Sequence, residues 1–203
     1  MMPIDKNLIT GLILAGGRGM RMGGIDKGLQ SFRGSPMVMH VLRCLQPQTR
    51  EVIINANQNL PIYEGFGTQV WPDQIAGFAG PLAGIQTGLL RCQTPYMACA
   101  PCDSPLLPVD LIARLADRLI VENTDLAVAV TIEEEAGLKR KQIHPVFSLM
   151  KVSVLDQLNS YLHNNGRQVR AWHANLQVSE VVFEDHTAFR NINTLRELEE
   201  FDY

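Results

Sequence analysis

A glycine-rich loop that follows directly on an apolar segment constrains this chain more than any other feature of its sequence. Residues 8–14 are largely apolar and include the β-branched Ile9, Thr10 and Ile13, which is typical of a strand buried in a sheet. The residues that follow combine closely spaced glycines with cations: Gly16, Gly17, Gly19, Gly23, Gly24, Arg18, Arg21 and Lys27. Glycines let backbone N–H groups approach an anion closely, and the cations add formal charge. The loop therefore predicts a binding site for a polyphosphate.

Neither of two well-known phosphate-binding loops fits this spacing. The dinucleotide fingerprint G-x-G-x-x-G begins at Gly17, but its last position is Met22 rather than glycine. The P-loop also fails, because Lys27 is followed by Gly28 rather than by serine or threonine. A glycine-rich surface turn is the simpler alternative, although a turn requires neither Arg21 nor Lys27.

The length and composition fit one domain with a proper core. The chain has 203 residues, of which 46% are hydrophobic. A formal net charge of −3 gives no general attraction to nucleic acid or to anionic membranes. Neither the first residues nor any later run has the pattern of a secretory signal or a transmembrane segment. We therefore expect a soluble, cytoplasmic protein.

The four cysteines leave two interpretations open. Cys99 and Cys102 have the C-x-x-C spacing of a redox or zinc motif, but no second pair with ligand spacing accompanies them. We expect Cys44, Cys92, Cys99 and Cys102 to be buried or partly buried thiols in a reducing compartment.

Strands and helices alternate along the rest of the chain. Strands are expected at residues 51–55, 68–71, 95–100, 126–132 and 145–149, with short candidates at 168–172 and 178–183. Helices are expected after an N-cap at Ser35, and at residues 80–91, 108–119, 151–163 and 194–201. The charged segment 133–142 is interpreted as a mobile connection or a hairpin tip. This alternation predicts a Rossmann-like, three-layer α/β/α fold with a mostly parallel central sheet.

Polar residues stand at the ends of several predicted strands. Ligands of such sheets bind beyond the carboxyl ends of the strands, so these residues are candidates for one pocket. They are Asn55, Asp73 and Asp103, followed later by His144, Asn191 and Asn193. Each of them is a weak indication alone, because polar residues commonly end strands.

Asp103 is the candidate metal ligand. Mg²⁺ takes oxygen ligands, commonly one or two carboxylates together with phosphates of the substrate. The alternative is an aspartate that caps the turn before Pro105.

Asn55 and Asp73 are candidates for recognising a nucleotide base. A guanine presents N1–H and N2–H₂ donors, which the side-chain oxygens of asparagine and aspartate accept. The alternatives are that Asp73 is a turn residue after Pro72 and that Asn55 only ends its strand.

Together these motifs resemble the MobA family of molybdenum cofactor guanylyltransferases. The pattern LAGG, three residues, RMG, two residues and DK, from Leu14 to Lys27, is similar to the signature loop of that family. Further family motifs match Asn55-Ala56-Asn57, Asp73 with the GPLAG of residues 80–84, Cys102-Asp103-Ser104-Pro105, His144-Pro145 and the N-x-N-T of residues 191–194. The resemblance covers nearly the whole chain, and it implies the fold of the nucleotide-diphospho-sugar transferases.

The resemblance also implies a reaction. GMP would pass from GTP to the terminal phosphate of molybdopterin, or of its molybdenum-loaded form, with release of pyrophosphate. In the N-terminal half, the GTP-binding residues would be Leu14, Ala15, Gly16, Gly17, Lys27, Asn55, Asp73 and Asp103. Arg21, Lys27 and Asp103 would be catalytic, with Asp103 holding Mg²⁺, and the C-terminal half would bind molybdopterin through His144, Asn191 and Asn193. Transient contacts with molybdenum-insertion proteins and with recipient molybdoenzymes or their chaperones are also expected.

Two alternatives remain at this point. The chain could be another nucleotidyltransferase of the superfamily, such as a cytidylyl or sugar-phosphate enzyme, with the same loop and a different base or acceptor. It could also be a nucleotide-binding domain without turnover. Arg21, Lys27 and Asp103 argue against the second alternative, because a purely binding domain needs no metal carboxylate. The charged segment 133–141 is a departure from what a pterin site requires, and a solvated loop is the preferred interpretation.

Overall fold

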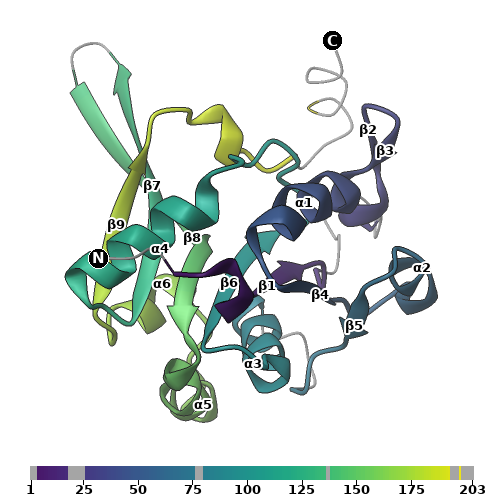
Figure 1. Ribbon diagram of the computed structural model, residues 1–203, viewed down its shortest axis with the longest axis horizontal. Helices are drawn as coiled ribbons and strands as arrows, with labels where there is room; N and C mark the ends of the chain where they lie inside the picture. The colour runs from purple at the N-terminus through teal and green to yellow at the C-terminus, as the bar shows by residue number, and fades with distance from the viewer. Residues whose placement is uncertain (1–3, 18–25, 76–79, 136–137, 193–196, 198–203) are drawn as a thin grey trace.

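The computed structural model describes residues 4–17, 26–75, 80–135, 138–192 and 197. Its centre is a seven-stranded sheet in the order β5-β4-β1-β6-β8-β7-β9 (Figure 1). The strands are β1 (Ile9–Leu14), β4 (Glu51–Asn55), β5 (Gln69–Trp71), β6 (Tyr96–Pro101), β7 (Leu126–Glu135), β8 (Leu138–Lys151) and β9 (Val178–Phe183). Strand β8 runs antiparallel to β6 and β7, and the other neighbouring pairs are parallel. The prediction of an α/β fold with a mostly parallel sheet is confirmed.

Helices cover both faces of this sheet. The α-helices are α1 (Met37–Leu45), α2 (Leu60–Glu64), α3 (Pro81–Arg91), α4 (Leu111–Glu122), α5 (Leu155–His163) and α6 (Val169–His173). Short 3₁₀ turns are η1 (Lys6–Leu8), η3 (Lys27–Leu29), η4 (Gln46–Gln48), η5 (Val152–Val154) and η6 (Thr187–Phe189), and a small ribbon pairs β2 (Ser31–Phe32) with β3 (Ser35–Pro36). The buried side chains of α1 and α4 form one core with the sheet, and those of α3, α5 and α6 form a second core. Figure 1 shows these two groups of helices on opposite sides of the strands.

Strand β1 lies between β4 and β6 and is buried from both sides. Ile9 and Ile13 belong to the core under α1 and α4, whereas Leu12 belongs to the core under α3 and α5. Side chains alternate between the two faces of a strand, so a strand covered on both faces favours apolar residues on each face. This double burial explains why the sequence before the glycine loop is largely apolar, and the buried hydroxyl of Thr10 is hydrogen-bonded to that of Thr94 (2.9 Å).

The charged segment 133–142 forms the arms of a hairpin. Strands β7 and β8 remain paired well beyond the rest of the sheet, and Figure 1 shows this ribbon projecting from it. Opposite charges face each other across the ribbon, with Glu133 opposite Arg140 and Glu134 opposite Lys139. Such cross-strand pairs stabilise a solvent-exposed ribbon. The hairpin alternative is confirmed, and the preferred interpretation as a solvated loop is wrong, because the described residues of this segment lie in paired strands. Residues 136–137 lie outside the described residues.

The prediction of a strand at residues 168–172 is wrong, because this segment forms helix α6. Val169 and Trp172 are three residues apart, so on a helix they lie on the same face. Trp172 is fully buried in the core shared with α3 and α5, and its indole N–H donates to the side-chain oxygen of Gln157. Burial of the indole on one helix face decides the conformation.

Two predicted helix starts are also wrong. Ser35 is paired in the ribbon of β2 and β3, and α1 begins at Met37 without a side-chain cap. Helix α4 begins at Leu111 rather than near residue 108, and Val109, which precedes it, is 83% exposed. The helix predicted at residues 194–201 lies almost wholly outside the described residues, as does the Asn193 position before it.

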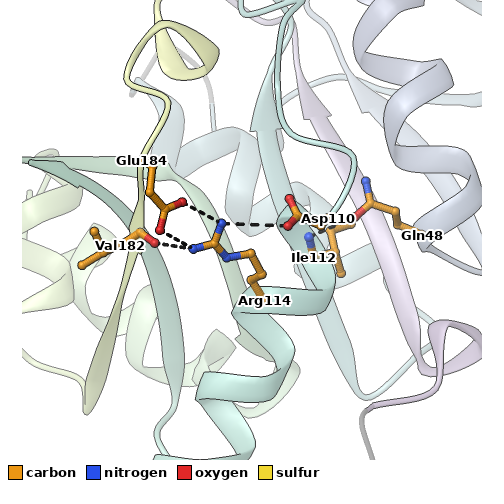
Figure 2. Close-up of polar contacts among 6 residues, drawn as sticks. All are labelled: Gln48, Asp110, Ile112, Arg114, Val182 and Glu184. Atoms are coloured by element: carbon orange, nitrogen blue, oxygen red, sulfur yellow. Dashed lines mark hydrogen bonds and ion pairs between the residues drawn. The ribbon is translucent and has the colours of Figure 1, made fainter.

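Polar contacts at the start of α4 fix this helix against β9 and against η4, the turn that follows α1 (Figure 2). The guanidinium of Arg114 donates to the carbonyl oxygen of Val182 (2.6 Å) and to the carboxylate of Glu184 (3.2 Å). The backbone N–H of Ile112 donates to Oε1 of Gln48 (3.0 Å). These contacts connect α4 with β9 on one side and with η4 on the other.

The thiols agree with the expectation from the sequence. Cys44, Cys92, Cys99 and Cys102 are free, and Cys99 and Cys102 are buried. Burial raises the pKa of the Cys99 and Cys102 thiols, so both are protonated at neutral pH. Among the helices in the described part of the chain, none has the length and apolar character needed to span a bilayer.

His173 predicts a loss of stability in acid. Its ring is buried, Nε2 has no hydrogen-bond partner, and burial lowers its pKa from 6.5 to about 4. Between these two pH values the unfolded chain binds a proton at His173 that the folded protein does not bind. The stability that the neutral ring contributes to the folded state is therefore complete above pH 6.5 and is lost as the pH falls through about 4. We expect His173→Gln to remove roughly 2 kcal/mol of the difference in unfolding free energy between about pH 7.5 and about pH 5.

Urea unfolding at the two pH values measures this difference. His163→Gln is the matched control, because His163 is exposed. An undiminished pH dependence in His173→Gln would contradict the assignment of this acid sensitivity to the buried ring.

Candidate functional site

The glycine loop leaves β1 between the carboxyl ends of β4 and β6. The backbone N–H of Ala15 donates to the carbonyl oxygen of Asn55 (2.7 Å), and the N–H of Cys102 donates to the carbonyl oxygen of Leu14 (3.0 Å). The parallel pairing of the strands therefore continues into the first loop residues. Gly16 is half-buried and Gly17 is exposed. Arg21, which the sequence placed on the phosphates, lies outside the described residues.

Asn55, Asn57 and Asp73 form one hydrogen-bonded cluster beside this loop. The Nδ2 group of Asn55 donates to Oδ1 of Asp73 (2.9 Å) and to the carbonyl oxygen of Trp71 (3.1 Å). The Nδ2 group of Asn57 donates to Oδ2 of Asp73 (2.9 Å). The structure thus brings Asn55 and Asp73 together, as predicted. Asn55 is only 2% exposed, however, and its two amide hydrogens are taken up by holding its neighbours.

Glycines at two points allow this close packing. A side chain at Gly16 would place its Cβ 2.7 Å from Nδ2 of Asn57, and one at Gly84 in α3 would collide with Oδ1 of Asn55 and with Leu14. Such contacts are not tolerated without displacement of the cluster. The first two turns of α3 therefore approach the ends of β1 and β4 closely because residue 84 has no side chain.

Thr87 of α3 holds the segment that carries Asp73. Its hydroxyl accepts a hydrogen bond from the backbone N–H of Gln74 (3.2 Å) and donates to the carbonyl oxygen of Pro72 (3.5 Å). Nothing in the sequence singles out Thr87, because a threonine within an apolar helix carries no signal of a polar contact in space. The residues before and after Asp73 in the chain are therefore both held by Thr87.

Lys27 of η3 and Asp103, which follows β6, form an ion pair. Nζ of Lys27 lies 3.3 Å from Oδ2 of Asp103, and both side chains are largely buried. Burial raises the pKa of the Asp103 carboxyl, while the Lys27 ammonium opposes this effect. The Asp103 carboxylate therefore contacts the ammonium of Lys27, the cation that ends the predicted phosphate loop. Among the described residues, no three His, Cys, Asp or Glu side chains gather as a metal site.

Asp26 anchors the turn that carries Lys27. Its Oδ1 accepts a hydrogen bond from the hydroxyl of Tyr63 (2.6 Å), and its Oδ2 accepts one from Nδ2 of Asn59 (3.0 Å). Tyr63 is fully buried, and a Cβ at Gly28 would lie 2.5 Å from its hydroxyl oxygen. This group is not visible in the sequence, because Tyr63 on a short helix has the pattern of a core residue.

His144 lies in an aromatic cluster with Phe147 and Phe189. Its Nε2 is 2.9 Å from the hydroxyl oxygen of Thr131, and its ring stacks on Phe189 with 4.7 Å between centroids. Burial, with a smaller contribution from Arg170, lowers the pKa of His144, so the ring is neutral at neutral pH. His144 is only 8% exposed.

The segment after β9 returns to Asp103. The backbone N–H of Ile192 donates to the carbonyl oxygen of Asp103 (2.8 Å), and the hydroxyl of Ser104 donates to Oδ1 of Asn191 (2.9 Å). Figure 1 shows this segment crossing from β9 toward the middle of the sheet. The structure therefore brings Asn191 beside Asp103, and Phe189 connects the same segment with His144.

Solved structures of nucleotidyltransferases share this fold. The molybdopterin-guanine dinucleotide biosynthesis protein A of Archaeoglobus fulgidus aligns with a TM-score of 0.75, covering 95% of this chain and 96% of that one at 19% identity. A CMP:2-keto-3-deoxy-manno-octonic acid synthetase aligns with a TM-score of 0.73, covering 98% and 97% at 12% identity. Residues 11–179 match the family described as MobA-like NTP transferase domain. By fold and family, the chain is a nucleotidyltransferase.

Sequence relatives are much closer than these structures. The molybdenum cofactor guanylyltransferase of Cupriavidus necator is 54% identical over 195 residues, which cover 96% of each chain. The one of Ralstonia nicotianae is 55% identical over 196 residues, with 96% of each chain covered. The chain belongs to the MobA-like NTP transferase family, together with these relatives.

Proposed function

We propose that this protein transfers GMP from GTP to molybdopterin, or to molybdenum-loaded molybdopterin, and releases pyrophosphate. The names of relatives that are more than half identical along almost the whole chain support this reaction. The structural observation that carries the proposal is the Asp73 carboxylate, fixed by two asparagine amides beside the glycine loop. A fixed carboxylate is complementary to the N1–H and N2–H₂ donors of guanine, whereas the corresponding edge of cytosine or uracil has a different pattern.

The guanosine would lie along the backbone from Leu14 to Gly17. Asp73 would accept hydrogen bonds from the base. Asn55 would hold Asp73 in place, because its amide hydrogens are already donated to Asp73 and to the carbonyl oxygen of Trp71. Strand ends of neighbouring parallel strands supply all of these groups, which is where ligands of open α/β sheets bind.

The triphosphate would lie between the loop and the pair of Lys27 and Asp103. Lys27 neutralises phosphate charge, and Arg21 is proposed to do the same from the loop. The largely buried carboxylate of Asp103 is an oxygen donor of the kind that Mg²⁺ prefers, and one carboxylate with substrate phosphates is a common Mg²⁺ site. When bound, Mg²⁺ would supply further charge neutralisation on the phosphates.

The chemistry needs no protein nucleophile. The terminal phosphate of molybdopterin carries the attacking oxygen, so the residues align it with the leaving pyrophosphate and offset the charge. In our proposal the N-terminal half of a single domain binds GTP, and the C-terminal half binds molybdopterin through His144, Asn191 and Asn193. Because His144 is buried and its pKa is lowered, its proposed role is to shape the molybdopterin-binding half rather than to donate a proton. A cytoplasmic location and transient contacts with molybdenum-handling proteins belong to the same proposal.

Pyrophosphate release tests this function directly. Purified protein with Mg²⁺ and molybdopterin is expected to release pyrophosphate with GTP, and not with ATP, CTP or UTP or without the acceptor. The fold alone does not choose among these nucleotides, because cytidylyl enzymes share it. Equal turnover with CTP would favour the cytidylyl alternative, and GTP binding without any turnover would favour a binding domain.

A further inference from the structure

The side chain of Asn57 makes three hydrogen bonds in the candidate site, more than a residue that only follows the end of a strand needs. Its Nδ2 group donates to Oδ2 of Asp73 (2.9 Å) and to the carbonyl oxygen of Gly16 (3.2 Å). Its Oδ1 accepts the backbone N–H of Asp73 (2.9 Å). Since both partners of Nδ2 are acceptors, the orientation of the amide is fixed. One side chain thus joins the glycine loop to both the backbone and the carboxylate of Asp73.

We propose that Asn57 is a positioning residue that sets the selectivity for guanine by holding the Asp73 carboxylate in one orientation. The inference rests on the proposed function, in which Asp73 accepts hydrogen bonds from the base. Asn57 itself would not contact the base, because its two amide hydrogens are committed to Gly16 and Asp73.

The geometry of the carboxylate explains why two amides are needed. An ionised carboxylate has about four acceptor sites on its two oxygens, and Asn55 and Asn57 occupy one on each oxygen. The remaining sites are left for a ligand with two adjacent donors. With Asn57 removed, Oδ2 and the N–H of Asp73 both lose a partner, and the carboxylate regains rotational freedom that binding must then remove.

Comparison with inosine triphosphate (ITP) isolates the contribution of the guanine N2 amino group to binding. Hypoxanthine keeps N1–H and lacks the N2 amino group, so the ratio of GTP to ITP affinity reports on the second donor alone. Asn57 also holds the carbonyl of Gly16, but a disturbed loop would weaken both nucleotides equally. The ratio therefore separates the hold on Asp73 from a general structural role.

Calorimetric titration of the full chain with GTP and with ITP, both with Mg²⁺, is the test. We expect Asn57→Ala to reduce the GTP to ITP affinity ratio roughly tenfold. Gln58→Ala, at the exposed neighbouring position, is the matched control and should keep the wild-type ratio. If Asn57→Ala does not fold by circular dichroism, Asn57→Ser is measured instead, with the same expectation. An unchanged ratio in a folded variant that binds both nucleotides more weakly would overturn the proposal.

A double-mutant cycle tests whether Asn57 acts through Asp73. Asp73→Ala should itself bring the ratio close to one, and adding Asn57→Ala should change the ratio by less than about twofold. A further large decrease in the double variant would mean that Asn57 acts on the base by another route, which contradicts the proposal. Wild-type protein that does not prefer GTP over ATP and CTP would instead refute the proposed function, so the two failures are distinguishable.

Discussion

Asp103→Asn is expected to lower the rate of guanylyl transfer at saturating GTP by about 10³-fold or more. The amide keeps the size of the carboxylate and loses the charge that would bind Mg²⁺, and the developing charge of the departing pyrophosphate is then poorly offset. Steady-state pyrophosphate release over a range of Mg²⁺ concentrations measures the effect. Asp103→Ala, which removes the oxygen ligand as well, should be at least as severe.

The stability of the variant separates this loss from unfolding. Burial raises the pKa of Asp103, so the folded protein holds its proton to a higher pH than the unfolded chain does, and the ionised carboxylate costs stability at neutral pH. The melting temperature of Asp103→Asn should therefore equal or exceed that of the wild type. Asp117→Asn, at an exposed position of α4, is the control for the lost charge. Turnover within about tenfold of the wild type would remove Asp103 from the mechanism.

Lys27→Ala is expected to weaken GTP binding by about 10- to 100-fold and guanosine binding by less than about twofold. A hydrogen bond to a charged phosphate contributes about 1.5–3 kcal/mol, whereas guanosine has no phosphate to lose. The variant also leaves the largely buried Asp103 carboxylate without its nearby ammonium, which adds repulsion toward the triphosphate. Titration with the two ligands, guanosine by competition, measures the difference.

Lys6→Ala provides the control for a lysine outside the site, because Lys6 is exposed on η1. A similar loss for GTP and guanosine in Lys27→Ala would contradict a phosphate role, and would instead indicate that the turn at Lys27 supports the base side of the pocket.

Much of the N-terminal half was predictable because its signals are local. The apolar run of β1 leads into glycines, and Gly80 with φ 76° followed by Pro81 starts α3 as the sequence indicates. The C-terminal half was predicted less well. Helix α6 was predicted as a strand, because only contacts with distant helices bury Trp172 and thereby decide its conformation.

The candidate site shows the same division. Lys27, Asn55, Asp73 and Asp103 were found from their residue types and their places in recognisable motifs. In the structure Asn55 contacts Asp73 at the ends of β4 and β5, and Lys27 of η3 contacts Asp103 after β6. Tyr63 and Thr87 were missed, because their contacts with Asp26 and with residues 72 and 74 depend on helix packing. Asn57 belonged to a recognised motif, yet its part in the site was visible only in the hydrogen bonds it makes.

By itself the sequence indicated the class of fold and the family, and it supplied the prediction of a phosphate-binding loop. Periodicity, glycine spacing and residue type act over a few neighbouring positions, and these are what decide a strand, a turn or a candidate ligand. Only the tertiary structure decided that Asn57 joins Gly16 to Asp73, across 41 and 16 positions in the chain. The physical reason is that such contacts follow from the parallel register of β1, β4 and β5 and from the close approach of α3 at Gly84. No short stretch of sequence specifies either of them.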